Sequence, residues 1–345
     1  MGTRDIIVVG ASAGGVTALK DFVQNLPKNF KGSVFIVLHI PPYTQSQLPL
    51  ILSKAGPLNA VHPQDEEEIV PGKIYVASND YHLLIAPGKV MVKRGPKENR
   101  FRPSIDALFR SAAYIYGSRV IGVVLSGILN DGVSGLWTIK QHGGLAIVQN
   151  PDDAEQPQLP QNALEYVEPD YVKPASEIGS LISELARKTA PERGQVLEKE
   201  LKRLEAEVLI AMKGNAFEMG IMNLGEFTPF TCPECHGALV KLVEGNIIRF
   251  RCHTGHAYTA SSLLAEVSEL VESDLWRSVR TLEEMSMLLS HIGEQFEKMN
   301  NPDAASLFYA KAEESTKRAR NIHDAVYLQN KYSEDLRLNN YNRTL

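Results

Sequence analysis

The chain has 345 residues, with 36 basic and 41 acidic side chains and a formal net charge of -5. So small an acidic excess gives no reason to expect a nucleic-acid-binding protein. Hydrophobic residues make up 43% of the chain and charged residues 22%. This composition excludes disorder and a collagen-like repeat and, at this length, predicts two or three folded domains.

Membrane and secretion signals are missing from the sequence. No apolar stretch approaches the ~18 residues that would span a bilayer. The N-terminus runs from Met1 to Asp5 directly into a strand pattern, with no signal-peptide profile. We therefore expect a cytoplasmic protein without membrane insertion. Its three cysteines are an odd number and all lie between Cys232 and Cys252, which favours metal binding over disulfide bonds.

Residues 6–184 alternate short β-branched runs with amphipathic segments of helical length. This pattern predicts an α/β fold with a doubly wound, mostly parallel sheet. Three runs, 73–77, 81–86 and 89–93, alternate in polarity between turn residues, which predicts a small antiparallel meander at one edge. The remaining runs are almost wholly apolar, as strands buried on both faces require: they are 6–9, 34–39, 120–126 and 145–149.

Helix signals fill the gaps between these strands and the second half of the chain. Ser104 is a predicted N-cap for a helix that Gly117 ends, and residues 158–160 open another short helix. Two long helices joined at residues 300–303 are predicted at the C-terminus, where they are expected to pack on the rest of the chain or on a second subunit. Beyond Ala186 an apolar stripe in a charged segment predicts a linker helix: it consists of Leu197, Leu201, Leu204 and Val208.

A glycine-rich turn, residues 10–15, follows the first strand and precedes an amphipathic helix. As a dinucleotide site the turn would need glycine in place of Ser12, and an acidic residue in place of His39 at the end of the second strand. As a nucleophile elbow, G-x-S-x-G would hold the Ser12 hydroxyl out at the carboxyl end of the sheet, beside backbone N–H groups that stabilise an oxyanion. A plain glycine-rich turn is the third interpretation.

Two further residues favour the nucleophile elbow. A serine hydroxyl needs an imidazole to take its proton and a carboxylate to orient that imidazole. His39 ends the second apolar strand, and Asp131 follows a third one. Because the carboxyl ends of parallel strands face one crevice, both can converge with Ser12 there. Taken singly, His39 could be a polar strand end and Asp131 a helix cap. Together the three predict a Ser-His-Asp triad.

Four motifs, in this order, resemble the catalytic domain of the bacterial chemotaxis protein-glutamate methylesterases, the CheB type. They are GASAGG at 10–15, HIPP at 39–42, RPSID at 102–106 and LSGILNDG at 125–132. The resemblance implies that Ser12 is the nucleophile, His39 the general base and acid, and Asp131 the carboxylate that orients His39, with no cofactor for catalysis. It also implies hydrolysis of glutamate methyl esters, and deamidation of glutamines, on chemoreceptor-like proteins.

Two departures from the family pattern bear on substrate and regulation. Ile128 and Leu129 stand where family members usually carry Met-Gly, in a segment whose backbone helps to form the oxyanion pocket. The first strand begins at Ile6, so the resemblance implies a stand-alone form without the N-terminal receiver domain. The competing hypothesis is a catalytically silent signalling or interaction scaffold.

The cysteines lie in two knuckles. Cys232 and Cys235 form a C-x2-C pair, an alternating hairpin follows, and Cys252 opens the sequence CHTGH. This predicts a two-stranded ribbon with a structural zinc ion at one end, held by three thiolates and an imidazole. We expect His256 as the fourth ligand in preference to His253, because the longer gap lets the chain turn back onto the metal. A redox pair and buried thiols are the alternatives.

These patterns predict four segments: an α/β domain over 1–186, a helical linker over 187–228, a zinc-ribbon-like module over 229–260 and a helical hairpin over 261–345. Arg249 and Arg251 in the ribbon are expected on a solvated face. Since no set of aromatic residues for base stacking accompanies them, nucleic-acid binding is only a minor alternative. The expected partner is a methylated receptor-like protein, and the C-terminal helices are a candidate surface for homo-oligomers.

Overall fold

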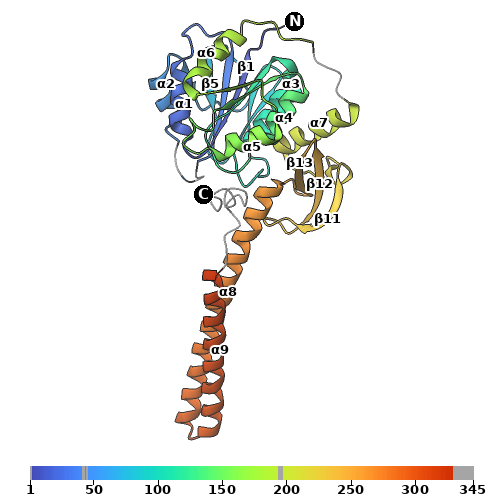
Figure 1. The fold of residues 1–345 in the computed structure, drawn as a ribbon. Coiled ribbons are helices and arrows are strands. Elements are labelled where there is room, and N and C mark those ends of the chain that lie inside the picture. Colours follow the sequence, from blue (N-terminus) through green and yellow to red (C-terminus); the bar gives the residue numbers. More distant parts are fainter. Residues whose placement is uncertain (1, 41–42, 44–45, 193–196, 329–345) are drawn as a thin grey trace, which may run out of the picture. The chain divides into compact units, whose positions relative to one another are not determined.

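The computed structural model describes residues 2–40, 43, 46–192 and 197–328 (Figure 1). Pro41 and Pro42 of the second motif, and residues 329–345 of the expected C-terminal hairpin, lie outside the described residues. The chain divides into two compact units, Met1–Leu263 and Leu264–Leu345.

Within the described residues, seven parallel strands form the main sheet of the first unit, in the order β10-β9-β8-β1-β2-β5-β3. The central strands β1 and β2 are buried along their whole length, which explains their unbroken apolar sequence. The bounds are β1 (Ile6–Ala11), β2 (Ser33–Leu38), β3 (Asn59–Val61), β5 (Lys73–Val76), β8 (Val120–Val124), β9 (Leu145–Gln149) and β10 (Tyr171–Lys173).

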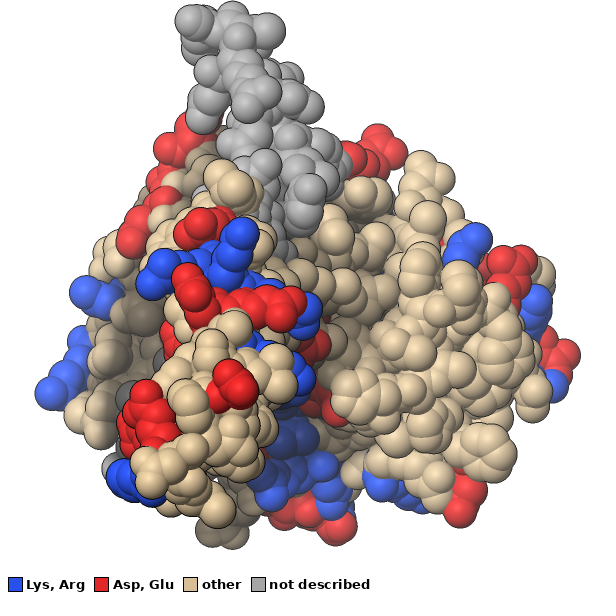
Figure 2. Space-filling view, turned by 90° about the horizontal axis from the view of Figure 1, so that it is seen from below, with Lys and Arg blue, Asp and Glu red and all other residues tan. Residues whose placement is uncertain are grey.

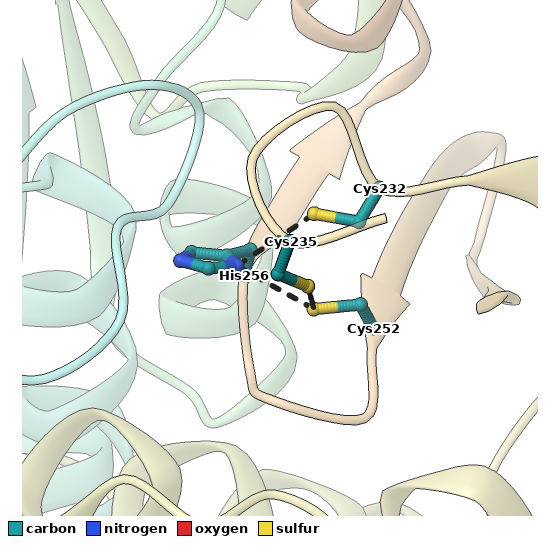
Figure 3. A group of neighbouring side chains, drawn as sticks. All are labelled: Cys232, Cys235, Cys252 and His256. Carbon is teal, nitrogen blue, oxygen red and sulfur yellow. Dashed lines mark hydrogen bonds between the residues drawn. The ribbon is translucent and has the colours of Figure 1, made fainter. Parts of the chain in front are cut away.

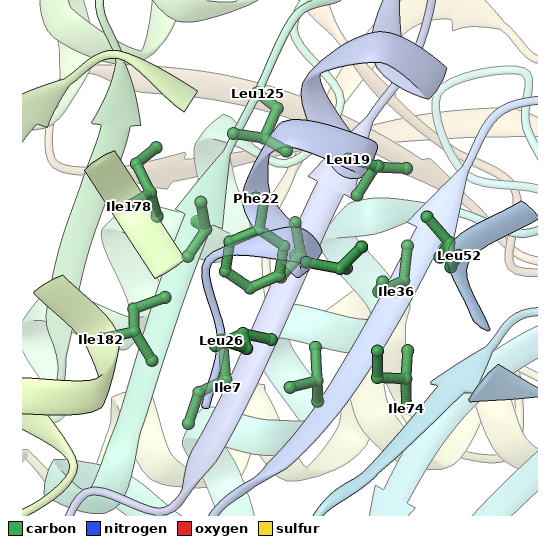
Figure 4. Packing of buried hydrophobic residues seen from close by; sticks show 14 of the residues in the cluster. Ile7, Leu19, Phe22, Leu26, Ile36, Leu52, Ile74, Leu125, Ile178 and Ile182 are labelled. Carbon is green, nitrogen blue, oxygen red and sulfur yellow. The ribbon is translucent and has the colours of Figure 1, made fainter. Parts of the chain in front are cut away.

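Helices cover both faces of this sheet (Figure 1). In the core on one face, Leu19 and Phe22 of the first helix pack over Ile7 and Ile36 of the strands (Figure 4). The predicted doubly wound α/β fold is therefore confirmed. One face carries α1 (Gly15–Gln24), α2 (Leu48–Ala55) and α6 (Ala175–Leu185), and the other carries α3 (Ile105–Tyr116), α4 (Val133–Gln141) and α5 (Gln158–Tyr166). A short 3-10 turn, Gly117–Arg119, follows α3.

The antiparallel meander differs from the prediction. β6 (His82–Ala86) and β7 (Lys89–Lys93) form its hairpin, and β4 (Glu67–Glu68) pairs with β7. Its predicted first strand, 73–77, is instead β5, a parallel strand of the main sheet. The alternation was misleading because Tyr75 is buried: its ring stacks on Phe35 and its hydroxyl donates to a backbone carbonyl.

After α6 the first unit continues with α7 (Glu198–Lys213), the predicted linker helix, and a 3-10 turn, Ile221–Asn223. A four-stranded antiparallel sheet then follows, where the sequence predicted two strands. The two added strands gave no clear pattern, because one has three residues and the other is an edge strand that contains Pro229. The strands are β11 (Glu226–Thr231), β12 (Ala238–Glu244), β13 (Ile247–Cys252) and β14 (Ala257–Thr259).

The second unit holds most of α8 (Ala260–Lys298) and all of α9 (Pro302–Leu328). The two helices lie antiparallel: Phe296 stacks on Phe308, and the Ser286 hydroxyl donates to the Ala312 carbonyl. The predicted helical hairpin is thus confirmed for the residues that the structure describes. None of the described helices combines the length and apolar character needed to cross a bilayer.

Candidate functional site

Three predicted site residues meet at the carboxyl ends of β2, β1 and β8, which are neighbours in the sheet. Ser12 follows β1, His39 follows β2 and Asp131 lies in the loop after β8. The Nδ1 atom of His39 is 3.2 Å from Ser12 Oγ, and its Nε2 atom is 2.8 Å from Asp131 Oδ2. A carboxylate only accepts hydrogen bonds, so the Nε2 proton faces Asp131 and leaves Nδ1 to accept from the serine hydroxyl.

The glycine-rich turn fixes the position of Ser12. The Ser12 N–H donates to the Ser126 carbonyl, and the Gly15 N–H closes the turn on the Ser12 carbonyl, both at 2.9 Å. Gly14 has a φ of 71°, in the left-handed region that favours glycine. A Cβ atom at Gly10 would lie 2.2 Å from the Ile105 side chain, so this glycine lets the start of α3 approach β1.

Asp131 is 1% exposed and accepts five hydrogen bonds, two of them from backbone N–H groups at the start of α3. Burial alone would raise the pKa of Asp131, but the hydrogen bond and charge of His39 and the other donors lower it. The helix N-terminus also favours the anion. Oδ1 accepts from Asn99, Ser104 and the Asp106 N–H, and Oδ2 accepts from His39 and the Ile105 N–H.

A second buried carboxylate lies next to the first. Asp106 Oδ1 accepts from the N–H groups of Gly132, at 3.1 Å, and Gly135, at 2.6 Å. Burial and the charge of Asp131 raise the pKa of Asp106. Asp106 lies in the first turn of α3, as the predicted Ser104 N-cap requires, but the sequence did not predict its proximity to Asp131.

Sequence reasoning missed two residues that touch the predicted triad. The Phe101 ring stacks on the His39 ring, with centroids 3.7 Å apart and planes 9° apart. The Asn99 side chain donates to Asp131 at 2.8 Å. Both residues lie in the three positions before the RPSID motif, but an amide and an aromatic side chain in a loop form no recognisable pattern.

The segment expected to help form an oxyanion pocket is held by α5. The Leu129 N–H donates to Gln158 Oε1 at 3.0 Å, and the Leu129 carbonyl accepts from Asn162 at 2.7 Å. These bonds hold Leu129 at a φ of 62°. The Leu129 N–H is therefore already hydrogen-bonded to Gln158 and does not point to a substrate. The side chain of the neighbouring Ile128 is 42% exposed.

The cysteine region brings four ligand atoms together at one end of the four-stranded sheet (Figure 3). Cys235 Sγ is 3.6 Å from Cys252 Sγ, and His256 Nδ1 is 3.6 Å from the sulfurs of Cys232 and Cys252. A tetrahedral zinc ion with ordinary bond lengths separates such atoms by about 3.5–3.8 Å. Three of the six separations match this range and all four ligand atoms lie within 4.8 Å of one another, so the group could hold a zinc ion.

Both knuckles are tight turns. The Cys232 N–H donates to the Gly237 carbonyl, and the Cys252 N–H to the His256 carbonyl. Hydrogen bonds from Cys232 and His256 lower the pKa of Cys252 and favour its thiolate, whereas the hydrogen bond with Cys252 and burial raise the pKa of Cys232. The alternative ligand His253 is not in the group of ligand atoms, and its ring packs against Gly237, where an added Cβ atom would lie 2.1 Å from it.

Arg249 and Arg251 correct one expectation. They were predicted on a solvated face, but they are 1% and 0% exposed. In β13 the alternation places these two guanidiniums inward and leaves Ile248 43% exposed. The inward face meets carboxylates from three other elements, which compensate the buried charges. The network of ion pairs includes six side chains that are each 1% exposed or less: Glu98, Arg110, Glu207, Glu244, Arg249 and Arg251.

Comparison with known proteins agrees with the fold and the motifs. Residues 7–182, about half of the chain, match the family model described as CheB methylesterase. The chain belongs to the CheB methylesterase family. As a member, it is a carboxylic ester hydrolase of the methylesterase type. The matched residues end at 182, so α7, the four-stranded sheet and the helical hairpin lie beyond the family model.

Individual relatives match the same part of the chain. A putative protein-glutamate methylesterase/protein-glutamine glutaminase of Leptospira interrogans is 38% identical over 190 residues, which cover 55% of this chain and 98% of that protein. A protein-glutamate methylesterase/protein-glutamine glutaminase of Thermotoga maritima is 35% identical over 184 residues, 52% of this chain and 54% of that protein. The crystal structure of the Thermotoga maritima CheB methylesterase catalytic domain superimposes with a TM-score of 0.51 at 34% identity, covering 54% of this chain and 99% of that one.

Proposed function

We propose that the chain hydrolyses methyl esters of glutamate side chains on a chemoreceptor-like protein, and deamidates glutamines there, with Ser12, His39 and Asp131 as its catalytic triad. The observation that carries the proposal is the continuous hydrogen-bonded chain from Ser12 Oγ through the His39 ring to Asp131 Oδ2. Family membership and the printed names of the relatives support the choice of substrate.

In the first half of the reaction, Ser12 Oγ attacks the ester carbonyl carbon while His39 Nδ1 takes the hydroxyl proton. The negative charge then moves to the carbonyl oxygen. The candidate donors for this oxyanion are the N–H groups of Ala13 and Gly14 at the start of α1, because Leu129 is engaged with Gln158. His39 returns the proton to the leaving oxygen, and methanol departs from an acyl-enzyme.

In the second half, water attacks the acyl-enzyme. His39 takes a proton from the water and returns it to Ser12 Oγ as the glutamate carboxylate leaves. Asp131 stays ionised throughout, since its five donors stabilise the anion, and it stabilises the imidazolium that forms in each half. With a glutamine side chain the same steps release ammonia in place of methanol.

A reactive Ser12 is testable before the substrate is identified. We expect a fluorophosphonate probe to label the full chain, and the Ser12→Ala variant to remain unlabelled. Ser183→Ala, which removes a hydroxyl from α6, is the matched control and should label as the wild type does. Methanol release from peptides carrying glutamate methyl esters then tests the substrate. Labelling of folded Ser12→Ala at the wild-type rate contradicts the assignment.

We also propose that Cys232, Cys235, Cys252 and His256 bind a structural zinc ion. Four protein ligands leave no open position, so the metal would stabilise the two knuckles and would not take part in catalysis. The separations of the four ligand atoms support this role.

Metal analysis of the purified full chain tests the zinc site. We expect about one equivalent of zinc in the wild type and in His253→Ala, and a loss of most of it in His256→Ala. Less than about half an equivalent in the gently purified wild type contradicts the site. Loss of zinc from His253→Ala but not from His256→Ala contradicts the ligand assignment.

Nucleic-acid binding gains no support from the two ribbon arginines, because both are buried in ion pairs. On the face in Figure 2, Lys and Arg side chains are interspersed with Asp and Glu and form no continuous basic area. A silent scaffold is also not favoured, since the hydrogen bonds that activate a serine are in place. Homo-oligomers through the C-terminal helices stay a prediction.

A further inference from the structure

The Asn99 side chain lies between two buried carboxylates. Its Nδ2 atom donates to Asp131 Oδ1 and to Asp106 Oδ2, each at 2.8 Å. An amide NH2 group has two hydrogens, and both are used here. Because Asn99 is 3% exposed, water does not readily replace either bond. The amide therefore fixes the distance between the Asp106 and Asp131 carboxylates. It also fixes the orientation of the Asp131 carboxylate, which faces His39.

The other end of the same amide is held from outside the family-matched residues. Asn99 Oδ1 accepts from the Thr259 N–H at 2.9 Å and from the Ser262 hydroxyl at 3.1 Å. The Asn99 N–H donates to the Ala257 carbonyl of β14 at 2.7 Å. Thr259 also contacts the residue before Asp131, since its hydroxyl donates to Asn130 Oδ1 at 2.7 Å.

The backbone around Asn99 depends on this support. Residues 98–101 form a turn closed by a 2.9 Å hydrogen bond from the Phe101 N–H to the Glu98 carbonyl. Its two central residues, Asn99 and Arg100, have φ values of 50° and 77°, as in a type I′ turn. Non-glycine residues in this region are strained unless their surroundings hold them. The turn ends in Phe101, which stacks on His39, so it contacts both the imidazole and the carboxylate.

We propose that Asn99 is a positioning residue for ester hydrolysis, and that the end of β14 and Ser262 hold it in its productive orientation. The inference rests on the proposed function of Ser12, His39 and Asp131. When β14 is docked, the amide points at Asp131 and the carboxylate orients His39. If β14 were displaced, Asn99 Oδ1 would lose the hydrogen bonds from Thr259 and Ser262. The Asp131 carboxylate could then rotate, and His39 would no longer align with Ser12.

Such a residue contacts no substrate in this scheme, so its loss should act on turnover and not on binding. We expect Asn99→Gly, which tolerates the positive φ of the turn, to lower kcat and the rate of fluorophosphonate labelling by ~10²-fold with KM unchanged. Ser262→Ala, which keeps the turn and removes one partner of the amide, should lower the labelling rate by less. Thr228→Val is the matched control, because it removes a ribbon hydroxyl that bonds to Leu239 and not to Asn99.

A spectroscopic readout separates positioning from a loss of folding. The His39 Nε2 proton that faces Asp131 should give a low-field proton NMR signal in the wild type and in Thr228→Val. We expect this signal to shift or broaden in Asn99→Gly and Ser262→Ala while their far-UV spectra stay unchanged. An unchanged signal and labelling rate in folded Asn99→Gly overturn the inference. If that variant does not fold, the same result with Ser262→Ala overturns it.

The outcome that contradicts the proposed function can be told apart from the outcome that contradicts the role of Asn99. A wild-type chain that the probe does not label, or that releases no methanol, contradicts the function or its substrate. The NMR signal needs neither probe nor substrate, so it still decides whether Asn99 positions Asp131.

Discussion

Replacement of Asp131 by asparagine is expected to lower kcat by about 10⁴-fold. The side chain keeps its shape, but one oxygen becomes an NH2 group. If that group occupies the Oδ2 position, it meets the His39 Nε2 proton and the Ile105 N–H; at the Oδ1 position it meets the Asn99 amide hydrogen. Hydrogen-bond donors then face donors in either orientation.

The loss of rate comes mainly from the histidine tautomer. When the NH2 group takes the Oδ2 position, it lies opposite Nε2, and the proton of the neutral ring moves to Nδ1, which faces Ser12 Oγ. A protonated Nδ1 cannot accept the serine hydroxyl proton, so attack on the ester carbonyl loses its general base. Probe labelling and methanol release should therefore fall together.

Asp170→Asn is the matched control for this variant. Asp170 also accepts a backbone N–H, that of Ala146, and pairs with Lys140, but it lies at β10, away from Ser12. We expect its kcat to stay near that of the wild type. A folded Asp131→Asn variant whose kcat lies within about tenfold of the wild type contradicts the role of Asp131.

Replacement of Glu207 by glutamine is expected to lower the free energy of unfolding by about 3–5 kcal/mol. Glu207 Oε1 lies 2.9 Å from an Arg249 nitrogen and 3.1 Å from an Arg251 nitrogen. All three side chains are buried, so removing the shared anion leaves Arg249 paired with Glu244 and Arg251 with Glu98, and each guanidinium has lost one of its two carboxylate partners. Glutamine also places an NH2 group against donors, which removes a hydrogen bond as well as a charge.

Urea unfolding of the wild type and of Glu207→Gln at several pH values measures this difference in the free energy of unfolding. Burial alone would raise the pKa of Glu207, but Arg249, Arg110 and Arg251 lower it well below 4.5. The stability that its charge contributes is therefore fully present above about pH 4.5 and is lost as the pH falls through the lower folded-state pKa. We expect the difference between wild type and variant to narrow in that acidic range.

Glu205→Gln, at an exposed position of the same helix, is the control and should change stability little. If Glu207→Gln were as stable as Glu205→Gln at neutral pH, the ion-pair network would not hold the four-stranded sheet to the rest of the first unit.

The fold of the α/β part and the meeting of Ser12, His39 and Asp131 could be predicted because both follow from local patterns. Each residue ends or follows an apolar strand, and parallel strands bring their carboxyl ends to one edge. Tyr75 shows where this reasoning fails: a single buried tyrosine imitates the polarity of an edge strand.

The contacts between the four-stranded sheet and the α/β part could not be predicted, because their partners are far apart in the chain. Arg251 pairs with Glu98, 153 residues away, and Asn99 accepts from Thr259, 160 residues away. Alternation in β13 reveals two faces but not which one is buried. The face of β13 that carries Arg249 and Arg251 is buried because Glu98 and Glu207 lie opposite it and pair with these arginines.

Asn99 and Thr259 are 160 residues apart in the chain, so Asn99 is synthesised well before the residue that holds its amide. Domains fold as they leave the ribosome, N-terminal part first. The core that α1, α2 and α6 cover is complete once α6 has emerged, and the core on the other face then lacks only Ile247, but the residues that hold the Asn99 amide are translated later. With the proposed role for Asn99, a nascent or truncated chain that ends before Ser262 is expected to fold its hydrolase part but to hydrolyse esters more slowly than the chain that continues past Ser262.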